Sequence, residues 1–227
     1  DFLGPSSISL ELINTIPISD NLKVPNIRQP YTVTEKADGV RNLLYITNSG
    51  KIYLINMNLE IIFTGCVSQN EKVYNTILDG ELVERDRKDR FINYFLCFDI
   101  YILNNKNIMH FPFVFMEGLK YPPKLSQELF RYNEMDKVIK NLKIISITGK
   151  NEPPLKIKSK RFYRNTAENI FSQCNVILSK EEEFIYETDG LIFTPINTGV
   201  GSDIIGEKLD TTSRLKKTWQ RSFKWKP

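Results

Sequence analysis

The chain has 227 residues, of which 41% are hydrophobic and 26% charged, and its formal net charge is +4. This composition suffices for a well-buried core in one large domain or two small ones. No apolar run approaches the roughly 20 residues of a membrane-spanning helix, and Asp1-Phe2-Leu3-Gly4 does not resemble the start of a secretory signal. We therefore expect a globular protein that is not exported and has no membrane partner.

The cysteine and histidine content excludes several kinds of chemistry. Cys66, Cys97 and Cys174 are odd in number and far apart, so disulfides and zinc are poorly supported, and we expect reduced thiols in the core. The one histidine, His110, lies in an apolar segment and is interpreted as structural. This removes mechanisms that depend on a histidine-containing triad.

Short apolar runs separated by turn residues predict a chain rich in antiparallel strands. Residues 1–30 carry four prolines among short apolar pieces, which predicts an irregular arm beside one domain at 31–227. Both ends of the sequence look cut, so we expect a fragment of a longer chain. Strands are predicted at Leu43–Thr47, Lys51–Asn56, Leu59–Phe63, Ile77–Glu84, Tyr94–Leu103, Phe184–Tyr186, Leu191–Pro195 and Ser222–Trp225, the first three as an antiparallel meander.

Two helices complete the prediction and give an α+β fold class. Apolar residues three or four positions apart predict an amphipathic helix from Ser126 to Leu142, with its first residue as the N-cap. A second helix is expected to begin at Asn165. The charged loop Arg85–Arg90 is either a solvated hairpin tip or a surface that faces RNA, and Pro112–Pro123 is expected to be irregular.

Five short motifs follow one another along the chain. The first reads Lys-x-Asp-Gly-x-Arg and by itself would be explained by a surface turn. Its meaning comes from the four motifs that follow in a fixed order, a set that is not expected by chance. The five motifs are Thr34–Arg41, Leu78–Val83, Tyr94–Ile100, Glu187–Phe193 and Ser222–Pro227.

This ordered set resembles the covalent nucleotidyltransferases, the superfamily of mRNA capping guanylyltransferases and ATP- or NAD-dependent polynucleotide ligases. The final Lys-Trp-Lys-Pro is similar to the capping branch, and the run at 189–195 resembles capping enzymes of large cytoplasmic DNA viruses. The resemblance extends from Ile27 to Pro227. It implies a nucleotidyltransferase domain of the ATP-grasp-like ligase and capping type, with antiparallel sheets flanked by helices. In that family an oligonucleotide-binding (OB) fold follows the last motif, and this sequence does not include one.

The first motif supplies a nucleophile. A lysine amine attacks phosphorus only when it is deprotonated, although its unperturbed pKa is about 10.4. Partial burial and nearby cations favour the neutral amine, and Arg41, Lys224 and Lys226 are candidate cations. The resemblance implies that Lys36 attacks the α-phosphorus of a nucleoside triphosphate and retains the monophosphate as a phosphoramidate.

The last motif supplies candidate phosphate ligands. Lys224 and Lys226 are two apart, so a strand would place both ammonium groups on one face, with Trp225 packed behind. An amphipathic edge strand with exposed lysines fits the same spacing, and the resemblance favours the phosphate role.

The acidic positions of the family are occupied by Glu81 and Asp189, which we expect to bind Mg²⁺ or Mn²⁺. Gly80 and Gly190, beside acidic residues, would permit close approach of the nucleotide. The resemblance gives Glu81 and Arg41 a further possible role as contacts to the ribose hydroxyls.

The resemblance also implies how a base is held. Phe98 matches the aromatic position on which the purine stacks, with Phe95 as the alternative, although both could be core residues. Thr34 stands where many DNA ligases have a glutamate, and its hydroxyl could donate to a guanine carbonyl. Lys160, before an aromatic pair, resembles a family lysine that reaches the same carbonyl.

The first hypothesis is an mRNA guanylyltransferase that takes GTP, forms a GMP–lysine adduct and passes GMP to 5′-diphosphate RNA. Flanking triphosphatase and methyltransferase domains or subunits are expected partners, in the cytoplasm and, for a viral protein, in a viral factory or virion. The alternatives are an ATP-dependent RNA or DNA ligase and a catalytically inactive binding module of the same fold.

Overall fold

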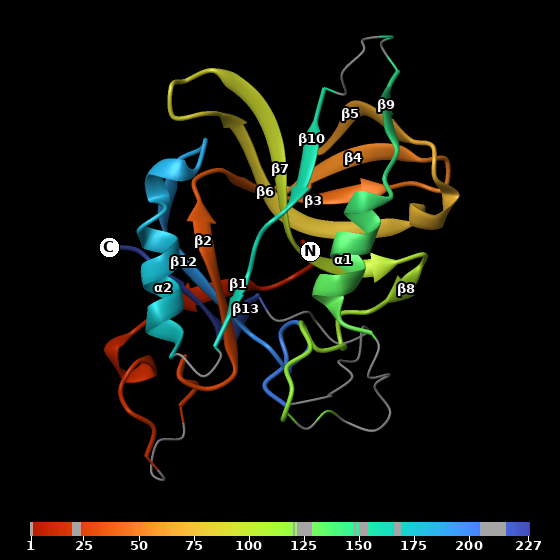
Figure 1. Ribbon diagram of the computed structural model, residues 1–227. Coiled ribbons are helices and arrows are strands. Elements are labelled where there is room, and N and C mark those ends of the chain that lie inside the picture. Colours follow the sequence, from red (N-terminus) through yellow and green to blue (C-terminus); the bar gives the residue numbers. More distant parts are fainter. Residues whose placement is uncertain are drawn as a thin grey trace.

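The computed structural model describes residues 2–19, 24–119, 121, 129–147, 149, 154–165, 169–204 and 217–227. Two β-sheets dominate these residues (Figure 1). The first sheet, here called the lysine sheet, has the strand order β1 (Ser6–Ser9), β13 (Thr218–Trp225), β12 (Thr188–Pro195), β2 (Tyr31–Ala37) and β11 (Tyr163–Arg164).

The second sheet, here called the large sheet, is built mostly from neighbouring antiparallel strands. Its order is β10 (Lys156–Ser159), β7 (Phe91–Leu103), β6 (Thr76–Arg85), β3 (Val40–Ile46), β4 (Lys51–Asn56), β5 (Ile61–Ser68) and β9 (Ile144–Ser146), with β8 (Lys106–Asn107) paired to β7. Parallel pairing occurs at β1–β13 in the lysine sheet and at β10–β7 in the large sheet.

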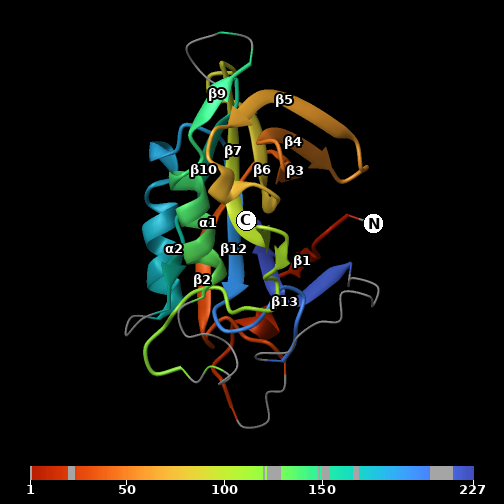
Figure 2. The same ribbon diagram turned by 90° about the vertical axis from the view of Figure 1, so that its right-hand side faces the viewer.

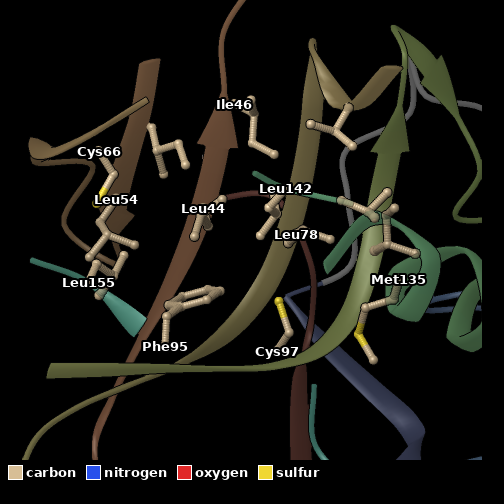
Figure 3. Packing of buried hydrophobic residues seen from close by; sticks show 14 of the residues in the cluster. Leu44, Ile46, Leu54, Cys66, Leu78, Phe95, Cys97, Met135, Leu142 and Leu155 are labelled. Carbon is tan, nitrogen blue, oxygen red and sulfur yellow. The ribbon is translucent and has the colours of Figure 1, made fainter. Parts of the chain in front are cut away.

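One helix packs on each sheet, and the two helices lie on the same side of the molecule (Figure 2). Helix α1 (Arg131–Lys140) packs on β7 and β10, where Met135 and Val138 enter the larger core cluster (Figure 3). Helix α2 (Ile170–Leu178) packs on β2. Side chains along β2 alternate between the two faces of the sheet. Tyr31 and Val33 enter the core with α2. Thr34 and Lys36 point to the other face.

The chain crosses between the sheets at the first motif. Strand β2 ends at Ala37, the pair Asp38-Gly39 turns, and β3 begins at Val40 in the large sheet. Lys36 therefore lies at the end of one sheet and Arg41 near the start of the other. This short crossing brings the two charged residues of the motif to the space between the sheets.

Most predicted elements are confirmed, and the α+β class with antiparallel sheets is correct. The meander occurs as β3, β4 and β5, and its middle strand has the predicted bounds. The three cysteines are buried and free. Three-residue 3₁₀ turns also occur at Leu12–Asn14, Glu71–Val73 and Glu181–Glu183.

Four predictions are corrected. No strand forms at 184–186, where a 3₁₀ turn leads into a bend. The second helix begins at Ile170, because Asn169, not Asn165, accepts a hydrogen bond from the Ser172 amide as the N-cap. The first helix begins at Arg131, and Ser126 lies outside the described residues. The N-terminal arm is not wholly irregular, since it contributes strand β1.

Candidate active site

A cavity of about 300 Å³ lies between the two sheets. This volume is at the lower end of the range typical of small-molecule sites, roughly 300 to 1,000 Å³. The lysine sheet contributes Thr34, Lys36, Ile192, Ser222 and Lys224 to its lining, and the large sheet contributes Arg41, Asp79, Glu81, Phe98 and Tyr101. Motif residues separated widely in the sequence thus share one cavity.

Lys36 is held at the cavity by a carboxylate from the fourth motif. Its Nζ lies 2.6 Å from Oδ1 of Asp189, and Nζ of Lys226 lies 2.5 Å from Oδ2 of the same side chain. Burial acts to raise the pKa of Asp189, but the hydrogen bonds from Lys226 and Lys36 outweigh it and leave this pKa below its usual value. The hydrogen bond to Asp189 raises the pKa of Lys226 in return. One ionised carboxylate therefore joins the first motif to the last.

Arg41 is fixed on the other wall by a buried acid. Its Nε and Nη2 bind the two oxygens of Asp79 at 3.1 and 2.6 Å, and its Nη1 donates to the Pro5 carbonyl at 3.0 Å. The Tyr101 hydroxyl also donates to Asp79. Burial lowers the pKa of Arg41, but Asp79 and Tyr101 raise it by more, so the guanidinium remains charged. Asp79 thus aims Arg41, a role that the sequence does not reveal.

Glu81 is a cavity carboxyl whose environment shifts its pKa strongly. It lies directly opposite Arg41 in the β3–β6 pairing and forms no hydrogen bond or ion pair within the described residues. Burial raises its pKa to about 7, although Lys160 and Lys36 oppose the shift. Near neutral pH this carboxyl is close to the midpoint of its titration.

The donor set is compatible with magnesium or manganese. Among the described residues no group of three or more His, Cys, Asp or Glu side chains could hold a metal ion by itself. Mg²⁺ is commonly bound by one or two carboxylates together with substrate phosphates and water. Within the described residues Glu81 lines the cavity and forms no hydrogen bond or ion pair, and Asp189, beside the cavity lining, is an ionised carboxylate that contacts Lys36. These two hard oxygen donors fit that mode of binding.

Thr34 and Lys160 lie at the cavity and both contact Glu35. The Thr34 hydroxyl lies 2.8 Å from Oε2 of Glu35 and 2.8 Å from the carbonyl of Arg161, and it donates its one hydrogen to one of these two acceptors. Nζ of Lys160 donates to the Glu35 carbonyl and lies 3.3 Å from its Oε1. The expected donation from Thr34 to a guanine carbonyl is therefore not available in this arrangement, because the hydroxyl hydrogen is already used.

Lys224 and Phe98 line the cavity, whereas Phe95 lies in the core. Lys224 pairs with Ile192, which pairs with Thr34, so these three side chains share the cavity face. Phe98 lines the cavity, 5.9 Å from the Arg41 guanidinium carbon, whereas Phe95 is fully buried in the core. The alternative that Phe95 stacks on the base is therefore wrong. Lys226 follows the last strand and contacts Asp189 without lining the cavity.

The two glycines make room for the protein itself, in contrast to the expectation from the sequence. A Cβ at Gly190, which has a φ of +131°, would clash with the Trp225 carbonyl oxygen, and a Cβ at Gly80 would clash with the Phe95 ring. Gly190 lets β12 approach β13 closely, and Gly80 lets β6 pack on β7. Close approach of a nucleotide is not what requires them.

Two sheets that enclose a cavity, a lysine at their crossing and a basic last strand are the features of a nucleotidyltransferase domain. A family model described as mRNA capping enzyme, catalytic domain, matches residues 19–205, so the chain belongs to that family. Strands β1 and β13, which line the cavity, lie outside the matched residues.

A curated relative and two solved structures agree with this assignment. The probable mRNA-capping enzyme of Acanthamoeba polyphaga mimivirus is 25% identical over 260 residues, covering 96% of this chain and 20% of the relative. The chain thus spans about a fifth of that protein. Mycobacterial DNA ligase D complexed with ATP and MES has a TM-score of 0.52 at 9% identity, over 98% of this chain and 60% of that chain. The ligase domain of M. tuberculosis LigD has 0.50 at 10% identity, over 98% and 59%. At these identities the two structures show a shared fold.

None of the helices in the described residues is long and apolar enough to cross a bilayer. The sequence missed several residues of the site, namely Glu35, Tyr101, Pro5 and the role of Asp79. Each acts through a contact with a distant part of the chain. The one local signal for Glu35 was its place directly before Lys36 in the first motif.

Proposed function

We propose that this domain is an mRNA guanylyltransferase that forms a covalent GMP adduct on Lys36. The observation that carries the proposal is the position of Lys36, whose amine lies at the cavity between the sheets beside an ionised Asp189. Membership of the capping family supports GTP as the substrate. The cavity lining supports the proposal with Lys224 on one wall and Arg41 on the other.

In the first step Lys36 Nζ attacks the α-phosphorus of GTP. A nitrogen–phosphorus bond forms, the bond from that phosphorus to the β-phosphate bridging oxygen breaks, and pyrophosphate leaves. An ammonium bound to a carboxylate has no free electron pair, so the Lys36–Asp189 ion pair must open and the amine must lose a proton before attack. Lys224 and Arg41 neutralise and orient the phosphates, which is the main contribution a protein makes to phosphoryl transfer.

Glu81 and Asp189 are the residues that would hold a divalent cation in this site. Bound there, Mg²⁺ or Mn²⁺ would neutralise phosphate charge as a Lewis acid. Asp189 would then exchange part of its contact with the two lysines for a metal contact. Arg41 has one N–H left beyond its bonds to Asp79, Tyr101 and Pro5, and with Glu81 it could contact the ribose.

In the second step GMP passes to RNA that ends in a 5′-diphosphate. A terminal phosphate oxygen attacks the adduct phosphorus, the nitrogen–phosphorus bond breaks, and the free amine of Lys36 is restored. The longer relative supports flanking triphosphatase and methyltransferase domains or subunits, which would supply the diphosphate end and modify the cap. Its viral source and the free buried cysteines support a cytoplasmic viral factory or virion as the location.

The test is nucleotide-specific labelling. The protein is incubated with magnesium or manganese and either GTP or ATP labelled at the α-phosphorus, and the denatured chain is separated by electrophoresis. We expect label from GTP and its release as capped product when diphosphate RNA is added. Label from ATP alone would support a ligase, and no label from either nucleotide would support an inactive binding module.

A further inference from the structure

Glu35 is a buried acid directly before the proposed nucleophile, and it binds the side chain of its neighbour Thr34 and two side chains from distant segments. The residue is 3% exposed, and Lys160 beside it is 6% exposed. Its Oε2 accepts the Thr34 hydroxyl at 2.8 Å, and its Oε1 accepts the Tyr186 hydroxyl at 3.0 Å and lies 3.3 Å from Lys160 Nζ. Both carboxylate oxygens are thus occupied by donors.

These contacts decide what Thr34 offers to the cavity. A threonine hydroxyl has one hydrogen and two lone pairs. Its two near neighbours, Oε2 of Glu35 and the carbonyl of Arg161, are both acceptors at 2.8 Å, so the hydrogen is directed to one of them. Thr34 lines the cavity and can present only lone pairs there.

Lys160 offers the opposite polarity. An ammonium has three hydrogens and no acceptor. The carbonyl and Oε1 of Glu35 engage two of the three, and Lys160 also lines the cavity. The third hydrogen is therefore available to a ligand. The wall presents an acceptor, Thr34, together with a donor, Lys160, and Glu35 fixes both.

We propose that Glu35 is a positioning residue that selects the base by fixing this pair of polarities. The inference rests on the proposed function, in which the cavity takes the purine of GTP. Guanine presents a carbonyl acceptor at O6 next to an N1–H donor, which matches a donor beside an acceptor on the protein. Adenine presents the reverse, an amino donor beside the N1 acceptor. A Thr34 hydroxyl free to rotate could donate to adenine N1, and Glu35 together with the Arg161 carbonyl removes that possibility.

The experiment compares adduct rates of the whole chain with GTP, ITP and ATP. ITP shares O6 and N1–H with GTP, so the wild type should use it within a few-fold of GTP and use ATP far less. In Glu35→Gln the amide can donate to Thr34, which leaves the Arg161 carbonyl as the protein acceptor that Thr34 contacts in the described residues, and Lys160 loses its charged partner. We expect the GTP-to-ATP ratio of kcat/KM to fall about tenfold or more, the scale of one hydrogen bond to a charged group, mainly through KM.

Three further variants separate base selection from damage to the fold. Asp86→Asn removes a buried carboxylate that binds Arg90 and does not line the cavity, so it should leave the ratio unchanged. Thr34→Val removes the acceptor at constant shape and should lower the ratio even if Glu35→Gln does not fold. Thr34→Ser keeps the hydroxyl and should retain the ratio.

The outcomes distinguish this inference from the proposed function. A wild type that forms no GTP adduct overturns both. A GTP-specific wild type whose ratio is unchanged in Glu35→Gln, or in Thr34→Val when Glu35→Gln is unfolded, overturns the role of Glu35 and leaves the guanylyltransferase assignment intact. A fall of the ratio in Asp86→Asn as large as in Glu35→Gln also overturns it.

Discussion

Asp189 Oδ1 lies 2.6 Å from Lys36 Nζ, although 153 positions separate the two residues in the sequence. Its second oxygen binds Lys226, so the same carboxylate ties the nucleophile's strand to the end of the chain. In the proposed mechanism this ion pair must open before Lys36 can attack, as nucleotide and metal compete for the carboxylate. The contacts of Asp189 with Lys36 and Lys226 therefore link the fold to the proposed adduct formation, and substitution of Asp189 tests this link.

Asp189→Asn should slow adduct formation about tenfold or more, since it removes an ionic contact of the kind that contributes roughly 1.5 to 3 kcal/mol. If Asp189 also binds metal, excess Mg²⁺ or Mn²⁺ should restore part of the rate, and Glu81→Gln should behave similarly. The measurement is the adduct rate as a function of metal concentration. Glu182→Gln, which changes a 95% exposed acid, is the matched control. Wild-type rates at low metal for both Asp189→Asn and Glu81→Gln would refute the metal assignment.

Glu81 gives a pH-dependent prediction of stability. Its pKa rises from 4.5 to about 7 in the folded protein, chiefly through burial. An acid with a raised pKa in the folded state contributes stability that is fully present below about pH 4.5 and is lost as the pH rises through about 7. Glu81→Gln stays neutral, so its melting temperature should rise relative to wild type between about pH 5 and pH 8. Glu84→Gln, on the exposed part of the same strand, is the control. A melting-temperature difference between Glu81→Gln and the wild type that does not change with pH would refute the raised pKa of Glu81.

The fold was predictable where the sequence pattern is local. The apolar runs of β3, β4 and β7 carry their own signal, and the five motifs fall on strands or strand ends around one cavity. Strand β1 has three serines in four residues and gains its structure from parallel pairing with β13, so no local pattern announces it. In the same way, the strand predicted at 184–186 has β-favouring residues but no partner in the described sheets.

The motifs predicted which residues meet at the site better than which residues position them. Lys36, Glu81 and Lys224 were predicted from residue type and motif order, and all three line the cavity. Glu35 acts through Lys160, which lies 125 positions away. Such a contact follows from packing between the sheets, and the sequence does not encode it as a spacing.

Asp79→Asn should destabilise the protein strongly, because it leaves the buried guanidinium of Arg41 without its counter-charge. Breaking a buried ion pair from one side costs about 3 kcal/mol or more, which corresponds to a fall of roughly 10 °C in melting temperature for a chain of this size. The KM for GTP should also rise as Arg41 loses its orientation. Asp89→Asn, which breaks an exposed pair with Arg85, should change stability by less than about 0.5 kcal/mol. Equal melting temperatures for the two variants would contradict this account of Arg41.

Lys224→Ala and Lys226→Ala should impair chemistry while leaving the fold intact. Lys224→Ala would remove a charge-assisted phosphate contact, and Lys226→Ala would remove the ionic contact to Asp189. An interaction of about 1.5 to 3 kcal/mol corresponds to a rate loss of roughly ten- to a hundredfold. Both lysines are exposed, so melting temperatures should barely change. Trp225→Ala should lower the melting temperature more than either lysine substitution, since this ring packs against the core cluster that includes α2. Unfolding in the lysine variants with unchanged adduct rates would make the strand purely structural.

The central claim is that Lys36 carries GMP, and mapping the adduct tests it most directly. The protein is incubated with GTP and magnesium or manganese, digested, and examined by mass spectrometry, with Lys36→Arg treated in parallel. We expect the mass of GMP on the peptide that contains Lys36, with the acid lability of a phosphoramidate, and no adduct in Lys36→Arg, because a guanidinium stays protonated at any working pH. GMP on another residue, or an undiminished adduct in Lys36→Arg, would contradict the account.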